Sequence, residues 1–183
     1  MHNNKTYNLL ILLLVFFLSS CTKQELETKI ASQEQQIDRF ITAQQDRGFR
    51  VVRKNGSNRL VLEEGKDANG QLPQDSLQYG DSVRFYYAGY IFSNGPGTLF
   101  ATNHEATAQA KGFQLTDPSF EIEAWLYQKN QWIPGLDNGF YGVRTGEHGY
   151  IVFSAKHGFE DESLYNIPRL SPLIYEYWIE AIK

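Results

Sequence analysis

The first half of the chain carries two apolar patterns of different kinds. Residues 9–18 form an unbroken apolar run, which is too short to span a bilayer but has the length of the hydrophobic region of a secretory signal peptide. Over residues 22–48 the apolar positions instead recur at spacings near three and four among Gln, Glu and Lys, at Leu26, Ile30, Ile37, Phe40 and Ile41. This spacing predicts an amphipathic helix, which Gly48 would end in the C′ position.

Beyond residue 48 the apolar residues alternate with polar ones over short runs, as in half-buried strands. Residues 49–53 and 59–63 flank Asn55-Gly56, a strong hairpin signal. Further strands are predicted at 83–92, 98–101, 120–127, 149–154 and 174–182. Pro134 suits the first position of a short helix over 134–141, whereas 102–118 and 156–172 look irregular. Several strands with one short helix predict an α+β domain with an antiparallel sheet.

Cys21 is the only cysteine of the chain and follows Leu18-Ser19-Ser20. This sequence resembles a bacterial lipobox, which implies that residues 1–20 are a lipoprotein signal peptide and that Cys21 becomes a lipidated N-terminus. An ordinary signal peptide, or a buried strand that ends in Cys, remains the alternative. Residues 21–48 would then form a helical tether, or a dimerisation or docking helix, before a domain at 49–183. Thr22, in place of the Asp typical of inner-membrane retention, favours the outer membrane, facing the periplasm.

Charge narrows the classes of partner. The formal net charge is −4, and without residues 1–20, whose only charged side chain is Lys5, it is −5. An acidic chain without a basic run is a poor nucleic-acid binder, so membrane attachment would come from the lipid on Cys21. The four histidines share no ligand spacing and no nucleotide-binding glycine motif occurs, so no metal or cofactor is expected. The acidic residues 117, 121, 123, 137, 147 and 160–162 are expected on the solvated surface.

Five segments carry a resemblance to a known family: 83–89, 98–100, 132–139, 142–147 and 167–175. The segment with Ile133, Gly135 and Gly139 resembles the strand-to-helix turn of the FK506-binding (FKBP-type) peptidyl-prolyl isomerases, and the other four follow in that family's order. The resemblance implies a curved antiparallel sheet wrapped around a short helix, with its core motifs in residues 80–183. It also implies an enzyme that acts on proline-containing polypeptides.

The resemblance assigns eight residues to a proline pocket. The residues implied to be catalytic are Tyr87, Phe100, Ile133, Phe159 and Tyr175. The residues implied to bind substrate are Trp132, Leu136 and Ile167. Ile133 would act through its backbone N–H, which binds a substrate carbonyl in the family. The other positions supply apolar walls, so the chemistry needs no acid, base or metal.

Three departures from the family pattern predict reduced activity. Ala101 occupies the place of an aspartate that braces the motif tyrosine, here Tyr87. Phe159 lacks the hydroxyl of its tyrosine counterpart, and the loss of one such hydrogen bond typically costs about 0.5–1.5 kcal/mol. The loop 160–166 is acidic and lacks the glycines usual there.

A second hypothesis therefore stays open. The chain layout resembles isomerase-like lipoproteins of gliding bacteria of the Bacteroidetes group, which are linked to motility and secretion machinery. On that hypothesis the domain is a non-catalytic interaction module in a membrane-associated envelope assembly, and Ala101 and Phe159 favour it.

Overall fold

The structure is a computed structural model of the chain that describes residues 3–66, 69–113, 122 and 124–183, with side chains described from residue 23 onward. Cys21, with its expected lipid, therefore lies outside the described side chains. The acidic positions 117, 121 and 123 lie outside the described residues, as does part of the predicted strand 120–127. The acidic residues Asp137 and Glu147 and the loop 160–162 are described.

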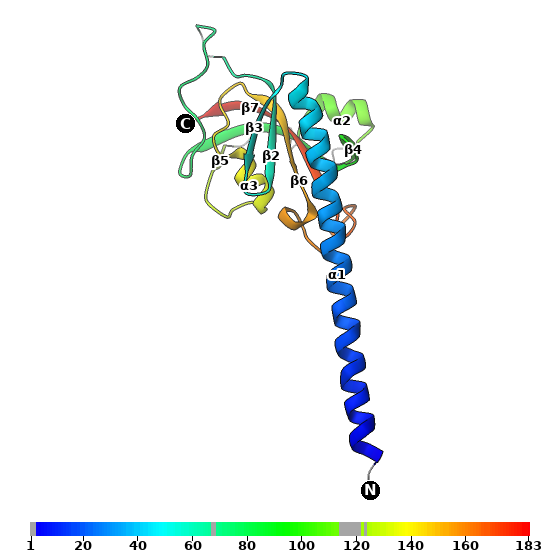
Figure 1. Cartoon of the computed structure of the whole chain (residues 1–183). Helices are drawn as coiled ribbons and strands as arrows, with labels where there is room; N and C mark the ends of the chain where they lie inside the picture. The colour runs from blue at the N-terminus through cyan, green and yellow to red at the C-terminus, as the bar shows by residue number, and fades with distance from the viewer. Residues whose placement is uncertain (1–2, 67–68, 114–121, 123) are drawn as a thin grey trace.

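A single long helix, α1 (Asn3–Asp46), begins the chain. Figure 1 shows its C-terminal part lying along the domain while its N-terminal part extends far beyond it. Gly48 adopts a φ of 93° just after the helix, and its N–H donates to Gln45 O at 2.9 Å, so the predicted glycine stop is confirmed. The helix begins well upstream of the predicted residue 22. Within the described residues, no helix is long and apolar enough to cross a membrane.

One antiparallel sheet forms the body of the domain. Its strands are β1 (Arg50–Lys54), β2 (Ser57–Glu63), β3 (Ser82–Phe92), β4 (Pro96–Thr102), β5 (Trp125–Leu126), β6 (His148–Phe153) and β7 (Leu173–Ile182). The spatial order is β1-β2-β6-β7-β3-β4, and β5 pairs with the start of β3. The central pair β3 and β7 runs in register from Val83↔Ile182 to Ile91↔Leu173, with one irregularity. The antiparallel α+β prediction is confirmed.

The hairpin of β1 and β2 turns at Asn55-Gly56, as the sequence predicts. Asn55 has a φ of 46° and Gly56 one of 81°. Two consecutive positive φ angles are what a tight hairpin turn matched to the strand twist requires, and Asn-Gly is the residue pair that adopts them most readily.

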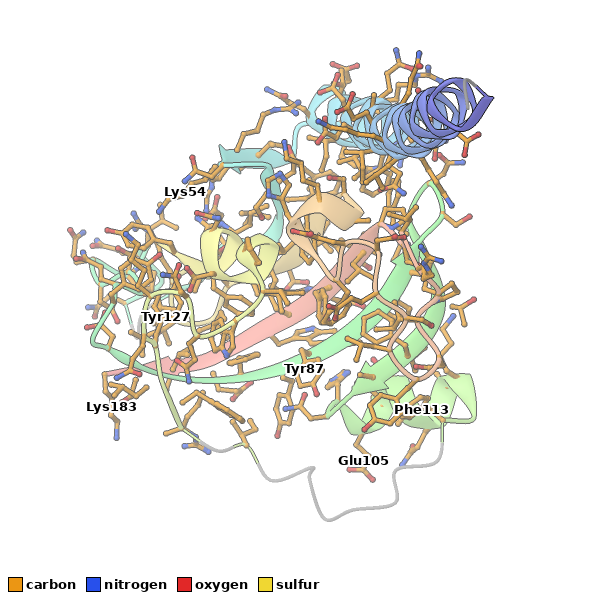
Figure 2. All side chains as sticks on the ribbon, turned by 90° about the horizontal axis from the view of Figure 1, so that it is seen from below. Lys54, Tyr87, Glu105, Phe113, Tyr127 and Lys183 are labelled. Carbon is orange, nitrogen blue, oxygen red and sulfur yellow. The ribbon has the colours of Figure 1, made fainter. Side chains whose placement is uncertain are left out.

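The two faces of the sheet bury different clusters, because side chains along a strand alternate between faces. On the concave face, Phe140 of the short helix α3 (Pro134–Phe140) packs with Tyr177 and Ile151. On the opposite face, Ile37 and Ile41 of α1 pack with Ile174. Figure 2 shows α3 inside the curve of β3 and β7. The curved sheet around a short helix is therefore confirmed.

Two local predictions are wrong. A helix, α2 (Glu105–Lys111), forms where the chain was expected to be irregular. It is short and Ala-rich, it buries only Ala108, and Gly112 ends it with a φ of 61°, so it carries no apolar stripe to signal it. The strand predicted at 120–127 is reduced, within the described residues, to β5. The loop 156–172 begins with the end of a 3₁₀ turn, η1 (Ala155–His157).

Two acidic residues expected on the surface are buried. Glu147 is fully buried, and its carboxylate accepts a 2.7 Å hydrogen bond from the Tyr177 hydroxyl and lies 3.4 Å from Arg59 Nε. Asp137 is 5% exposed and accepts hydrogen bonds from the Tyr79 hydroxyl and the Asn130 N–H. Donors from other segments offset the loss of water at Glu147 and at Oδ2 of Asp137, whereas Oδ1 of Asp137 is buried without a hydrogen-bond partner among the described residues.

Candidate active site

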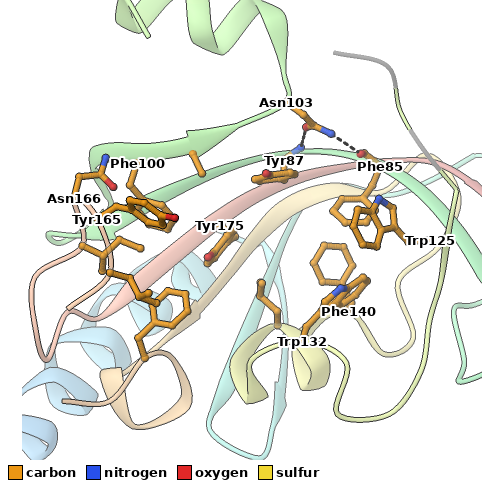
Figure 3. Close-up of a pocket in the computed structure, with 15 residues that line it drawn as sticks. Phe85, Tyr87, Phe100, Asn103, Trp125, Trp132, Phe140, Tyr165, Asn166 and Tyr175 are labelled. Carbon is orange, nitrogen blue, oxygen red and sulfur yellow. Dashed lines mark hydrogen bonds between the residues drawn. The ribbon is translucent and has the colours of Figure 1, made fainter. Parts of the chain in front are cut away.

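A pocket of about 450 Å³ opens on the concave side of the sheet. Strands β3, β4, β5 and β7, helix α3 and the loop 156–172, hereafter the flap loop, contribute to its walls. Figure 3 shows that its lining is dominated by aromatic rings.

The back wall consists of aromatic rings from the central strands. Phe85 and Tyr87 are two residues apart on β3 and therefore face the same side. Phe100 from β4 meets Tyr175 from β7 edge-to-face, with ring centroids 5.6 Å apart. Gly89 makes this contact possible, because a Cβ at its position would lie 2.7 Å from the Phe100 ring and 3.0 Å from Tyr175.

The opposite wall comes from α3 and the residues just before it. Trp132 contacts Phe85 and Phe140, with ring centroids 5.8 Å and 5.2 Å apart. Leu136 also lines the pocket. Gly135 lets α3 approach the sheet, because a Cβ there would lie 2.2 Å from the Phe153 ring.

Ile133 is the one predicted site residue whose side chain does not line the pocket. It precedes α3 as its N-cap residue and packs against the core. Its C=O accepts from the N–H groups of Leu136 and Asp137, each at 3.0 Å. Its own N–H donates to no other group in the described part of the chain.

The flap loop closes the remaining side. Its pocket-lining residues are Phe159, Leu164, Tyr165, Asn166 and Ile167. Leu164 and Ile167 form a two-bond turn, with N···O distances of 3.1 Å and 2.7 Å. The turn places Tyr165 at its tip, where the residue has a φ of 47° and its side chain is fully exposed. A bulky residue in this backbone region is uncommon, and it presents an aromatic ring at the mouth of the pocket.

Tyr87 is held by its backbone and not through its hydroxyl. Asn103 accepts from Tyr87 N at 2.6 Å and donates through Nδ2 to Phe85 O at 3.2 Å. Thr102 Oγ1 donates to Tyr87 O at 2.7 Å. Within the described residues the Tyr87 hydroxyl makes no hydrogen bond, and Ala101 lines the pocket where the family's aspartate is expected. The side chain that fixes this part of β3 is therefore Asn103.

None of the described residues that line the pocket has a charged side chain. Its most buried ionisable groups are the phenols of Tyr87 and Tyr175, and burial raises the pKa of both above the ordinary value for tyrosine. A raised pKa keeps each phenol neutral to higher pH. The site is therefore a neutral, largely apolar slot, and among the described residues no three His, Cys, Asp or Glu side chains gather in a way that could hold a metal ion.

Seven of the eight residues predicted from the resemblance line this pocket with their side chains, and Ile133 lies beside it. The sequence reasoning missed eight further lining residues: Phe85, Ala101, Asn103, Trp125, Phe140, Leu164, Tyr165 and Asn166. The two-residue strand period could have placed Phe85 beside Tyr87. Trp125 lies in the predicted strand 120–127, but the alternation there did not show which face would line the pocket. Asn103 lies in the segment 102–118, which has no apolar periodicity, so no pattern indicated it.

Comparison with known proteins agrees with this geometry. The sequence profile of the FKBP-type peptidyl-prolyl cis-trans isomerases matches residues 74–179, more than half of the chain. The crystal structure of FkpA from Escherichia coli is similar over 99% of this chain and 73% of that chain, with a TM-score of 0.57 and 16% identity. The structure of the three FKBP domains of wheat FKBP73 is similar over 74% of this chain and 49% of that chain, with a TM-score of 0.55 and 16% identity. No curated protein matches the sequence directly.

The chain therefore belongs to the FKBP-type peptidyl-prolyl cis-trans isomerase family, and its enzyme class is that of the family. The solved structures, at 16% identity, establish the likeness of fold.

Proposed function

We propose that the aromatic pocket binds the proline of a polypeptide and catalyses rotation about the preceding peptide bond. The observation that carries the proposal is the pocket itself, a neutral slot of about 450 Å³ whose walls are largely aromatic. An X-Pro bond rotates slowly because amide resonance must be broken, at a barrier of roughly 18–20 kcal/mol.

The slot can lower that barrier without proton transfer. The planar amide is polar and well hydrated, whereas the twisted transition state has lost much of its charge separation. A pocket that replaces water by aromatic walls therefore favours the twisted form. The Ile133 N–H, at the start of α3, has no partner among the described residues and would supply a donor for a substrate carbonyl beside the slot.

The same geometry supports a rate of isomerisation lower than that of a site that keeps the family's polar groups. Ala101 leaves the Tyr87 hydroxyl without a partner in the described part of the chain, and Phe159 offers no hydroxyl to a bound peptide. Each missing hydrogen bond is worth about 0.5–1.5 kcal/mol, or up to about tenfold in rate if it acts in the transition state.

We place the enzyme in the bacterial envelope, anchored by lipid on Cys21 and facing the periplasm from the outer membrane. The apolar run at residues 9–18, the lipobox-like Leu18-Ser19-Ser20-Cys21 and Thr22 support this location. Its clients would be envelope polypeptides whose folding waits on X-Pro isomerisation.

A second candidate is a non-catalytic FKBP-fold module in a membrane-associated motility or secretion assembly. Ala101 and Phe159 favour it, because they remove polar groups from the family's site while keeping the apolar pocket. Such a module would bind proline-containing segments without accelerating their rotation.

The test is an isomerase assay on soluble protein that begins at Thr22, with tetrapeptides that vary the residue before proline. Tyr87→Ala and Phe100→Ala remove pocket walls, and Leu72→Ala, an exposed residue outside the pocket, is the control. We expect kcat/KM to fall by about tenfold or more in both pocket variants and to stay unchanged in the control. Circular dichroism verifies folding, and Phe100→Leu replaces Phe100→Ala if the latter unfolds. A parent protein that is inactive on every peptide rules out the enzyme proposal and leaves the binding module.

A further inference from the structure

Gln33 is a buried polar side chain on α1, 6% exposed, and both ends of its amide are hydrogen-bonded. Its Nε2 donates to Leu170 O at 2.7 Å, and its Oε1 accepts from Ala155 N at 3.0 Å. One partner is a carbonyl and the other an N–H, so only this orientation of the amide satisfies both. The side chain therefore joins α1 to two backbone positions that are close in space but distant in sequence.

Those two positions are the two ends of the flap loop. Ala155 immediately precedes the loop, and Leu170 lies just before its last residues. The ends are also joined through Glu160, whose N–H donates to Ala155 O at 2.9 Å and whose C=O accepts from Leu170 N at 3.0 Å. Gln33 thus completes a small network at the base of the loop that carries Phe159, Tyr165 and Ile167 to the pocket.

The helix can hold the loop because it is itself fixed to the sheet. Gln33, Ile37 and Ile41 are spaced four residues apart and lie on one face of α1. Ile37 is 2% exposed and Ile41 is fully buried against the sheet face opposite the pocket. Residues 34–36, 38 and 39, which lie between them, are exposed. The docked face of α1 therefore carries an amide aimed at the flap loop.

We propose that Gln33 is a positioning residue of the isomerase site, and that docking of α1 sets the conformation of the flap loop. The helix is then part of the pocket's support and not only a spacer before the domain. The catalytic consequence rests on the proposed function, whereas the mechanical link between helix and loop does not.

The first test measures the loop itself, by amide hydrogen exchange on the chain that begins at Thr22. Gln33→Met keeps a long side chain but loses both hydrogen bonds, and Gln36→Met makes the same change at an exposed site of the same helix. We expect exchange at Ala155 and along the flap loop to rise about thirtyfold in Gln33→Met, the factor for the loss of two ordinary hydrogen bonds. Exchange in β3 should stay unchanged, and Gln36→Met should match the parent.

The second test measures kcat/KM for the same variants at a temperature where urea titration shows them folded. We expect about a three- to tenfold decrease in Gln33→Met and none in Gln36→Met. Gln33→Asn keeps the amide but shortens its reach, so it should raise flap-loop exchange and lower kcat/KM as Gln33→Met does. It is the decisive variant if Gln33→Met fails to fold. Flap-loop exchange and kcat/KM equal to those of Gln36→Met would overturn the proposal. If the parent has no isomerase activity, the proposed function fails, while the exchange result still decides the role of Gln33.

Discussion

At the scale of single residues, the site shows that one position can be held in place by groups other than those its family uses. The Tyr87 backbone is bonded to Asn103 and Thr102, whereas its hydroxyl has no partner within the described residues. Its ring contributes a wall of the pocket. We therefore expect Tyr87 to act through its ring and not through its oxygen.

Tyr87→Phe should for this reason leave kcat/KM within about twofold of the parent and change the unfolding free energy by less than about 0.5 kcal/mol, because the hydroxyl of the half-buried Tyr87 has no hydrogen-bond partner to lose within the described residues. Tyr177→Phe is the matched control. It makes the same chemical change but removes the 2.7 Å bond to the buried Glu147, and it should cost about 1–3 kcal/mol of unfolding free energy. Urea titration and the isomerase assay measure both. A tenfold loss of activity in Tyr87→Phe would show that the hydroxyl acts on the client.

The sequence predicted site residues that stand in short local motifs, but not residues whose place depends on contacts between distant segments. Tyr87, Phe100 and Tyr175 stand in short motifs of fixed spacing, so a family resemblance could locate them. Asn103 contacts the pocket from a segment with no apolar period. Glu147 looked like a surface residue because its partners, Tyr177 and the arginines Arg50 and Arg59, lie on other strands, and a contact between distant segments leaves no local pattern.

At the scale of elements, α1 has a docked part and a projecting part. Ile37 and Ile41 are buried on the sheet, whereas the N-terminal turns extend away from the domain (Figure 1). Periodicity predicted the helix and its end at Gly48, since an amphipathic stripe and a glycine stop are local signals. The sequence did not predict which strands this stripe covers. Apolar residues alternate along each strand of the sheet, so the pattern does not single out the strands that pack against α1.

Ile41→Ala should destabilise the domain by about 2–5 kcal/mol, the usual range for a large-to-small change at a fully buried position. Ser32→Ala, at an exposed position of the same helix, should change stability by less than about 0.5 kcal/mol. Urea unfolding followed by circular dichroism measures both. Equal stability of the two variants would mean that α1 is detached from the sheet in solution.

At the scale of the whole molecule, the chain forms three layers, with α1 on one face of the sheet and α3 and the pocket on the other. If Cys21 carries a lipid, the anchor and the site are joined by the same helix, whose Gln33 contacts both ends of the flap loop. The chain would then present its pocket on a support that begins at the membrane. Removal of residues 22–48 would strip the sheet face as well as the tether, so loss of function after that deletion would not by itself implicate a partner.

Four partly or largely buried groups, two histidines and two tyrosines, have pKa values shifted away from neutral pH. Burial lowers the pKa of His104 and His157 below 6.5 and raises that of Tyr87 and Tyr175 above 10. The stability linked to the histidines is therefore lost only as the pH falls below about 6.5, and that linked to the tyrosines only as it rises above about 10. Between about pH 7 and pH 9, none of these four groups should change its protonation.

The pH dependence of kcat/KM is the measurement that tests the central claim most directly. We expect isomerisation of an uncharged tetrapeptide to be independent of pH from about pH 7 to pH 9, because an apolar slot favours the twisted amide without donating or accepting a proton. The parent and Tyr87→Phe should give the same flat profile. A bell-shaped or sigmoidal profile within that window would show that a titrating group takes part in the reaction and would contradict the account.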